Sequence, residues 1–460
     1  MKIAGVDIGT TTLCGQLLDS RTGEILSVVT EPNSFALPAA APWESLQDAE
    51  AISRAAARII DRFSASHGRI EAIGVAGQMH GILYVNSGGE AISPLYTWQD
   101  GRGERDMGSG TSYAGALSAS IGMPVSTGMG LVTHFYNVRN RLVPEGATSL
   151  CTIADYAAMR LARRSQPLMD ATNAAGLGCF DLRKLEFRFN AIKALGLNPD
   201  ILPPVAHMYP VLGRTAGGTP VFTALGDNQA SFLGSVRQVD GSLLVNVGTG
   251  SQISQFMQEC VDIPGIDTRP FPMGGCMCVG SALCGGKAYA VLLDFFERTV
   301  RLFAGQAGGA SWEVMNNVTP QSAGSQGAAA GEPLAVDTRF AGTWMGPEIR
   351  GGIAGIGTVN FTPENLINGV REGIARELLG FFEKFPAAIR GSRTALVGSG
   401  NGIRLNGGLQ KVFEDRLGMK MLVPAHREET AFGAALLAGV ACGALPDLGA
   451  AGKLIRYFER

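Results

Sequence analysis

Residues 7–12, with the sequence Asp-Ile-Gly-Thr-Thr-Thr, constrain the fold of this chain most, because they join two apolar runs by a short turn. The runs at residues 3–6 and 13–18 predict two antiparallel strands of a hairpin. A turn rich in hydroxyl and N–H groups can hold phosphate oxygens. The carboxylate of Asp7 beside it can hold Mg²⁺, which prefers carboxylate and phosphate oxygens. Taken alone, the same pattern is also typical of an ordinary hairpin with a solvated aspartate.

A near-copy of this hairpin lies far downstream. Residues 243–247 form an apolar run, residues 248–251 (Gly-Thr-Gly-Ser) form the turn, and Ile253 and Phe256 follow among polar residues. Two such hairpins in the two halves of one chain suggest an internal duplication. The duplication favours two phosphate-binding turns that face each other across a cleft and grip a nucleoside triphosphate from both sides.

The length and composition indicate a globular protein with two domains. The chain has 460 residues, of which 46% are hydrophobic and 17% are charged, and this length can supply two large cores. We place the domain boundary near residues 237–241, which divides the chain into residues 1–238 and 239–460. The net charge of −2 and the lack of a basic block argue against nucleic acid as a partner.

No stretch predicts secretion or membrane binding. Asp7 interrupts the N-terminal apolar run, unlike a signal peptide. The longest apolar stretch, residues 431–445, is about 15 residues long where a membrane span needs about 20, so we expect a small-residue helix packed closely against a sheet. Cys276, Cys278 and Cys284 lack the spacing of a zinc site, and we expect buried free thiols in a reducing cytoplasm.

Strands and helices alternate along the chain, which predicts a mixed α/β fold. Residues 304–333 are rich in Ala, Gly, Ser and Gln and predict a surface excursion. A helix at residues 364–382 should begin after Thr362, a good N-cap, with Pro363 at the first helical position. Further helices are expected at residues 49–63 and 407–417, and strands at residues 70–75, 83–85, 220–225, 243–247 and 394–397.

Asp227 is the first candidate for chemistry. It stands between the end of a strand and a small-residue helix within residues 224–231. A carboxylate in that position can point into a cleft near a helix N-terminus, or it can simply cap the helix. The residues alone leave both interpretations open.

Three other stretches carry groups suited to a sugar or a nucleotide. Residues 78–81 (Gln-Met-His-Gly) follow a strand and suit a small polar ligand, although a single His is more often structural. Residues 98–102 (Trp-Gln-Asp-Gly-Arg) combine groups typical of sugar sites, although a core Trp beside a surface ion pair fits them too. Residues 397–402 (Val-Gly-Ser-Gly-Asn-Gly) let the backbone approach a phosphate or a flat ring, but they lack the full dinucleotide fingerprint.

Taken in order, these motifs resemble the FGGY carbohydrate kinases, members of the actin-like ATPase superfamily. The resemblance runs essentially end to end and is highly specific because all the motifs occur in the family's order. One departure is Ser399, which stands where many relatives have a third consecutive glycine, so the residues that contact adenine stay open. The matching motifs are residues 7–11, 78–81, 98–100, 226–229, 248–250, 398–401 and 429–435.

The resemblance implies an α/β fold of two duplicated ribonuclease-H-like domains, with ATP and a sugar in the deep cleft between them. Asp227 would act as the general base on a sugar hydroxyl, and Asp7 would position Mg²⁺. The sugar site would be lined by Gln78, Met79, His80, Trp98, Asp100 and Asn228. ATP would be bound by Gly9, Thr10, Thr11, Gly248, Thr249, Gly250, Gly398, Gly400 and Asn401.

The expected reaction is ATP-dependent phosphorylation of the terminal primary hydroxyl of a ketose. Residues 81–85, 93–100 and 397–404 favour sedoheptulose, with sedoheptulose 7-phosphate as the product. D-xylulose is the alternative, because the Gln-Met-His-Gly pattern is shared. A non-enzymatic nucleotide switch of the actin-like type is a further alternative, against which the sugar-site motifs argue. The oligomeric state stays open, with a homodimer among the options.

Overall fold

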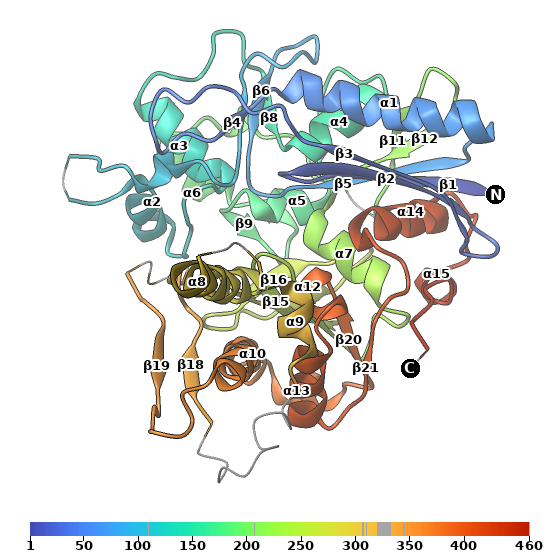
Figure 1. Cartoon of the computed structure of the whole chain (residues 1–460). Coiled ribbons are helices and arrows are strands. Elements are labelled where there is room, and N and C mark those ends of the chain that lie inside the picture. Colours follow the sequence, from blue (N-terminus) through green and yellow to red (C-terminus); the bar gives the residue numbers. More distant parts are fainter. Residues whose placement is uncertain are drawn as a thin grey trace.

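The computed structural model describes residues 1–305, 308–309, 311–319, 333–343, 346 and 348–459, except Ser109 and His207. The described elements form two large β-sheets flanked by helices (Figure 1). The first sheet has the strand order β11-β12-β5-β1-β2-β3, and β13 also pairs with β5. Its strands are β1 (Lys2–Ile8), β2 (Thr12–Asp19), β3 (Ile25–Pro32), β5 (Ala72–Gly77), β11 (Val211–Arg214), β12 (Pro220–Phe222) and β13 (Leu225–Gly226).

The second sheet is built from the later half of the chain. Its strand order is β16-β17-β15-β14-β20-β21. The strands are β14 (Ser242–Val247), β15 (Ser251–Met257), β16 (Asp267–Pro270), β17 (Cys276–Ala282), β20 (Ala395–Ser399) and β21 (Met421–Leu422).

Both sheets grow from the predicted hairpins in the same way. In the first, β1 and β2 are antiparallel, β3 extends the hairpin antiparallel to β2, and β5 joins β1 in parallel. In the second, β14 and β15 form the hairpin, β17 extends it antiparallel to β15, and β20 joins β14 in parallel. The repeated layout confirms the predicted α/β fold of two duplicated units.

Helices cover the outer face of each sheet. Apolar side chains of α1 (Ala49–His67) and α4 (Ile153–Leu161) share one core with strands of the first sheet. Those of α8 (Gly286–Ala304), α10 (Pro363–Phe382) and α13 (Gly407–Leu417) share another with the second sheet. Each helix presents an apolar stripe to its sheet, which is the usual way such layers are stabilised.

Two helices lie between the sheets, α7 (Asp227–Ser235) and α14 (Glu429–Ala441) (Figure 1). Their apolar side chains share a third core with the inner faces of both sheets. The contact is close: a Cβ on Gly5 would lie 1.9 Å from the carbonyl oxygen of Ala431, and a Cβ on Gly433 would lie 1.9 Å from that of Ala230. The small-residue stretch is therefore a helix packed against a sheet, as predicted.

Most predicted elements are found near their expected bounds. α10 begins at Pro363, and the Thr362 side chain accepts a hydrogen bond from the N–H of Asn365. The expected strand at residues 220–225 is divided into β12 and β13. Within the predicted excursion at residues 304–333, the structure describes α9 (Trp312–Asn317) and a few neighbours; the rest of that prediction lies outside the described residues. The division at residue 238 stays a prediction, and α14, from the later range, packs on the first sheet.

The cysteine prediction is wrong for Cys276. This residue forms a disulfide with Cys260, and their Cα atoms lie 5.3 Å apart, within the range that a disulfide requires. The chain that leaves β15 turns back so that Cys260 lies beside the start of β17, a pairing that spacing along the sequence could not reveal. Cys278 and Cys284 are buried free thiols, as predicted. Among the described residues, no helix is long and apolar enough to cross a membrane.

Candidate functional site

The first turn is held by side chains from other parts of the first unit. The amide of Asn33 donates to the carbonyl oxygen of Gly9 at 2.8 Å, and the amide of Gln47 donates to that of Thr10 at 3.1 Å. The N–H of Gly9 donates to the carbonyl oxygen of Thr12 at 2.9 Å, which closes the turn. Thr11 is exposed. The predicted hairpin turn is thus present, with Thr11 at its exposed end; its binding of phosphate stays a prediction.

The side chain of Thr10 also links this turn to the predicted sugar motifs. The indole Nε1 of Trp98 donates to Thr10 Oγ1 at 2.9 Å. The amide of Gln78 donates to Gln47 Oε1 at 3.2 Å, and Gln47 holds the turn carbonyl described above. Gln78 is thus a buried support of the phosphate turn, and Trp98 is half-buried with its N–H committed to that turn.

The second turn is held by backbone alone. The carbonyl oxygen of Gly248 accepts from the N–H of Gly286 at 2.8 Å, and that of Thr249 accepts from the N–H groups of Gly285 and Lys287 at 3.1 and 3.0 Å. These donors begin α8, so the first turn of the helix fixes the loop. A Cβ on Gly248 would meet no atom within 4 Å, and Thr249 is exposed, which leaves open space beside the turn for a ligand.

The glycine-rich motif after β20 lies beside this second turn. Gly400 has a φ of +79°, and a Cβ there would lie 2.5 Å from the carbonyl oxygen of Val247. Gly398 is packed equally tightly, against Met421 and Ile403. Asn401 begins the short helix α12 (Asn401–Arg404) and is exposed. The glycines thus bring this backbone against the end of β14, immediately before Gly248.

Asp7 is half-buried at the end of β1, and its Oδ1 atom is buried with no hydrogen-bond partner. Burial and the negative charges of Asp227 and Glu428 raise the pKa of this carboxyl well above its usual value. A bound cation would relieve both effects, so the residue fits the Mg²⁺ role predicted for it. Among the described residues, no group of three or more His, Cys, Asp or Glu side chains is placed to hold a metal.

Asp227 is the first residue of α7, and Gly226 occupies the N-cap position. The Asp227 carboxylate accepts hydrogen bonds from the backbone N–H groups of Asn228 and of its own residue, so it bonds to the helix N-terminus while it is a candidate for chemistry. Burial raises the pKa of its carboxyl to about 6, and the charge of Arg269 acts in the opposite direction. A carboxylate that is ionised at pH 7 and close to its pKa is suited to proton abstraction.

Met79 lies next to Asp227 in space, and His80 follows it along the chain. A Cβ on Gly226 would lie 2.6 Å from the sulfur of Met79. His80 has a φ of +77°, and its Nδ1 lies 2.6 Å from the carbonyl oxygen of Gly176. A carbonyl only accepts, so Nδ1 carries the proton and Nε2 is an acceptor. Burial and Arg269 lower the pKa of His80 and keep the ring neutral.

Asn228 joins the two units. Its amide nitrogen donates to Oε1 of Gln252 on β15, while its own Oδ1 is buried and has no partner. That oxygen can accept a hydrogen bond from a hydroxyl group of a ligand.

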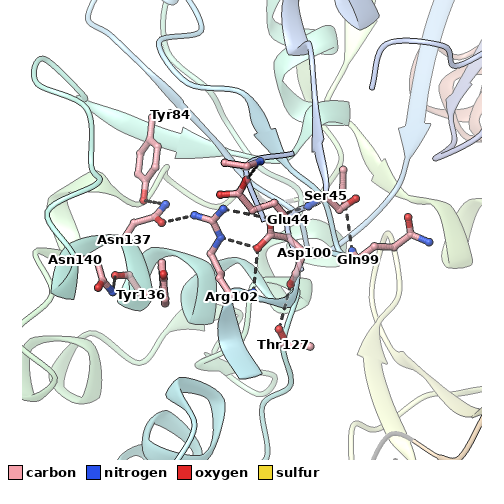
Figure 2. A network of polar contacts seen from close by, with 12 residues as sticks. Glu44, Ser45, Tyr84, Gln99, Asp100, Arg102, Thr127, Tyr136, Asn137 and Asn140 are labelled. Carbon is pink, nitrogen blue, oxygen red and sulfur yellow. Dashed lines mark hydrogen bonds and ion pairs between the residues drawn. The ribbon is translucent and has the colours of Figure 1, made fainter. Parts of the chain in front are cut away.

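Asp100, by contrast, does not face an open site. It is fully buried, its Oδ1 accepts from Arg102 Nε at 2.6 Å, and its Oδ2 accepts from the N–H of Ser45 at 3.1 Å. Figure 2 shows this network, in which Arg102 also reaches Asn137. A carboxylate whose two oxygens are paired with a buried guanidinium and a backbone N–H stabilises its loop. The predicted sugar contact is therefore not supported, and Asp100 instead fixes the loop that carries Trp98.

Three residues of the site escaped the sequence analysis. Arg269 on β16 reaches Met79, with Nη1 3.8 Å from the sulfur. Glu428, at a φ of +60° just before α14, acts electrostatically on Asp7. Gln252 pairs with Asn228. Arg269 and Gln252 lie on strands at positions that belong to no motif. Glu428 is marked by its positive φ, which the sequence does not reveal. No sequence signal therefore indicated these residues.

The two sheets of like layout, each with its hairpin, and the helices packed between them define an α/β protein of the actin-like ATPase fold. The chain belongs to the FGGY family of carbohydrate kinases, because the model of that family's N-terminal domain matches residues 2–234. The structure resembles that of a xylulose kinase from Rhodospirillum rubrum, with a TM-score of 0.82 and 20% identity over all of this chain and 93% of that one. At this identity the likeness shows the fold.

Sequence relatives cover less of the chain. A sedoheptulokinase from Mus musculus is 31% identical over 288 residues, which are 55% of this chain and 58% of that protein. A xylulose kinase from Escherichia coli is 26% identical over 267 residues, 53% of this chain and 52% of that protein. The matches thus span little more than half the length of these curated relatives.

Proposed function

We propose that this protein is an ATP-dependent kinase that phosphorylates the terminal primary hydroxyl of a ketose. Sedoheptulose is the first choice of substrate and D-xylulose the second, in line with the relatives that the sequence resembles. The observation that carries the proposal is Asp227, a buried carboxylate at the start of α7 whose pKa is raised to about 6. Met79 packs beside it, and the charge of Arg269 acts both on Asp227 and on the neutral His80. The cytoplasm is the proposed location.

The chemistry follows from this placement. Asp227 accepts the proton of the terminal hydroxyl as that oxygen attacks the γ-phosphorus of ATP in line with the leaving oxygen. His80 Nε2 and Asn228 Oδ1 accept hydrogen bonds from neighbouring sugar hydroxyls and orient the acceptor. Holding both reactants in one geometry supplies a large part of the rate acceleration.

The two turns hold the phosphates from opposite sides. The turn formed by Gly9, Thr10 and Thr11 offers its threonine hydroxyl groups from the first sheet, and the turn formed by Gly248, Thr249 and Gly250 offers its threonine hydroxyl group and its backbone from the second. Gly398, Gly400 and Asn401 lie next to the second turn and form the nucleoside side of the site. Asp7 would hold Mg²⁺, with Glu428 nearby, and the ion would neutralise charge on the phosphates.

Coupled measurement of ADP release with a panel of ketoses tests the proposal. We expect sugar-dependent turnover with sedoheptulose above that with D-xylulose. Asp227→Asn should bind ATP nearly as well as the unmodified protein and lose about 10²- to 10⁴-fold in turnover, the range for a lost general base. Asp294→Asn, on the exposed side of α8 in an ion pair with Arg298, is the matched control.

Two outcomes would contradict the proposal. Near-normal turnover by Asp227→Asn would remove this residue from the base role. Nucleotide-dependent assembly without phosphoryl transfer to any sugar would favour the actin-like switch instead. Sedimentation in ATP and in ADP separates these cases and also shows whether the protein is a homodimer.

A further inference from the structure

Arg269 enters the acceptor site from the opposite unit. It lies on β16 of the second sheet, yet its Nη1 is 3.8 Å from the sulfur of Met79, a residue of the first unit. Met79 in turn packs on Gly226, directly before Asp227. The next residue along β16, Pro270, accepts a hydrogen bond from the Gln229 side chain at 2.9 Å, so the strand is anchored to the helix that carries Asp227.

The guanidinium is largely buried but only partly paired. Its side chain is 12% exposed, and its Nε donates to Asp267 Oδ2 at 2.6 Å. Within the described part of the chain, its side-chain contacts are this carboxylate and the Met79 sulfur. A thioether is a weak acceptor, and a guanidinium has five N–H donors. Several donors of a mostly buried cation therefore lack strong acceptors beside the proposed acceptor site.

The charge of the Arg269 guanidinium also acts on Asp227 and on His80. The charge of Arg269 lowers the pKa of Asp227 against the larger effect of burial, and it adds to the effect of burial in lowering that of His80. A cation at this point supports an ionised base and a neutral imidazole together. Sugar hydroxyls are suitable acceptors for the remaining N–H groups.

We propose that Arg269 is a substrate-contacting specificity residue, which donates hydrogen bonds from the second sheet to hydroxyl or carbonyl oxygens of the bound ketose. The inference rests on the proposed kinase function and deepens it. In this proposal, a residue of β16 contacts oxygens of the sugar other than the oxygen that receives the phosphoryl group. It also makes the acceptor site complete only when both units contribute to it.

The chain offers a closely matched control. Asp267-Thr268-Arg269 and Asp337-Thr338-Arg339 are the same tripeptide, and each contains an ion pair between its own Asp and Arg with a shortest distance of 2.6 Å. The Arg339 side chain is 41% exposed. Arg269→Gln and Arg339→Gln therefore remove the same group from the same local motif, once beside the acceptor site and once elsewhere on the molecule.

Kinetics and sugar binding test the inference together. We expect Arg269→Gln to raise the KM for the ketose at least about tenfold, because hydrogen bonds to charged donors are the strong ones. The KM for ATP and the thermal midpoint should stay close to those of the unmodified protein. Arg269→Lys should recover part of the loss, and Arg339→Gln should leave both KM values unchanged.

A deoxyketose panel identifies the contact. One deoxy sugar lacks the oxygen that Arg269 contacts. For that sugar, the increase in KM caused by Arg269→Gln and the increase caused by the missing oxygen should not multiply, because both remove the same contact. Losses that multiply for every deoxy position, or equal KM values for the two Gln variants, would overturn the inference. Calorimetric binding of the ketose without ATP keeps the two proposals apart. If the unmodified protein binds the ketose but shows no turnover, and Arg269→Gln weakens that binding, only the kinase proposal is contradicted. If the unmodified protein binds no ketose, both proposals are contradicted.

Discussion

The two hairpin turns have the same plan but are held in different ways. The first depends on the side chains of Asn33, Gln47 and Trp98, which come from elsewhere in its unit. The second depends on backbone N–H groups at the start of α8. Side chains that hold a turn can also contact other motifs, so they can couple the turn to them. Backbone N–H groups at a helix start fix the turn without such contacts. The first turn is thus tied directly to the acceptor motifs, whereas the second hairpin reaches them only through Gln252, on the strand that follows its turn.

The two strands that lead into the turns also differ at one equivalent position. Asp7 in β1 and Asn246 in β14 both stand two residues before the glycine of the turn. Asp7 has a buried unpaired oxygen, whereas the amide of Asn246 donates to Ser399 Oγ at 2.8 Å. At this position the duplicated scaffold therefore has a carboxyl group in one unit only, which suits a single cation beside the phosphates.

Among the changes that separate the two turns, exchanging the residues at this position should give the largest effect. In Asp7→Asn we expect turnover to fall about 10- to 100-fold, the range seen when groups around a bound metal are altered, and the requirement for Mg²⁺ to move to higher concentration. Asn246→Asp, the reciprocal change, should mainly weaken ATP binding, because it adds a negative charge beside a phosphate turn. Turnover measured over a Mg²⁺ titration checks both, and equal responses in the two variants would contradict the asymmetry.

A change in the second cradle should affect only the nucleotide. A Cβ on Gly286 would lie 2.5 Å from the carbonyl oxygen of Gly248, so Gly286→Ala must shift the turn. We expect the KM for ATP to rise about tenfold, equivalent to roughly 1.4 kcal/mol, with the KM for the ketose nearly unchanged. Gly407→Ala is the control, because it also lies at a helix start and a Cβ there meets open space.

A change in the first turn should affect both substrates. Trp98→Phe removes the N–H that Thr10 Oγ1 accepts, which should cost about 1 kcal/mol, or roughly fivefold, in the KM for ATP and in that for the ketose. A double-mutant cycle with Thr10→Val should show that the two changes are not additive. Trp312→Phe, at a half-exposed Trp on α9, is the control. An effect on one substrate alone would break the proposed link.

The sequence was sufficient for the architecture because periodic signals dominate it. The hairpins, the capped helix α10 and the small-residue helix α14 each carry a local pattern of apolar residues, caps or glycines. Such patterns report local conformation and burial directly. The duplication was visible for the same reason, since it repeats one local pattern.

The details of the site were less accessible because they depend on contacts between distant segments. Asp100 and Arg102 look like a sugar-binding pair in sequence, but in space they satisfy each other in a buried network. Arg269 reaches the acceptor site only through the packing of the second sheet against the first unit. The partner of Cys276 likewise depends on how one loop returns. A sequence pattern shows which groups are present, whereas a site depends on which of them remain unpaired after folding.

The smallest expected effect is a gain in stability that accompanies the loss of activity in Asp227→Asn. Burial raises the folded-state pKa of this carboxyl to about 6 from 3.8. The ionised carboxylate therefore lowers the free energy of unfolding. This penalty is complete above pH 6 and absent below about pH 4, where the carboxyl is protonated in both states. The variant should melt higher than the unmodified protein at pH 7.5, and the difference should shrink as the pH falls from 6 to 4. In the unmodified protein, kcat/KM should fall over the acid side of pH 6.

The ionised form of a second aspartate, Asp337, has the opposite effect on the stability of the folded protein. Hydrogen bonds and charge from Arg339 lower the pKa of Asp337, so its ionised form stabilises the folded state at neutral pH. Asp337→Asn should therefore melt slightly lower at pH 7.5, by the small amount expected for a half-exposed ion pair, and this deficit should vanish at low pH. Thermal melts of both variants between pH 4 and 8 check the contrast. A difference for Asp227→Asn that does not vary with pH would show that its carboxylate is not penalised by burial, and the assignment of a base with a raised pKa to the first unit would then fail.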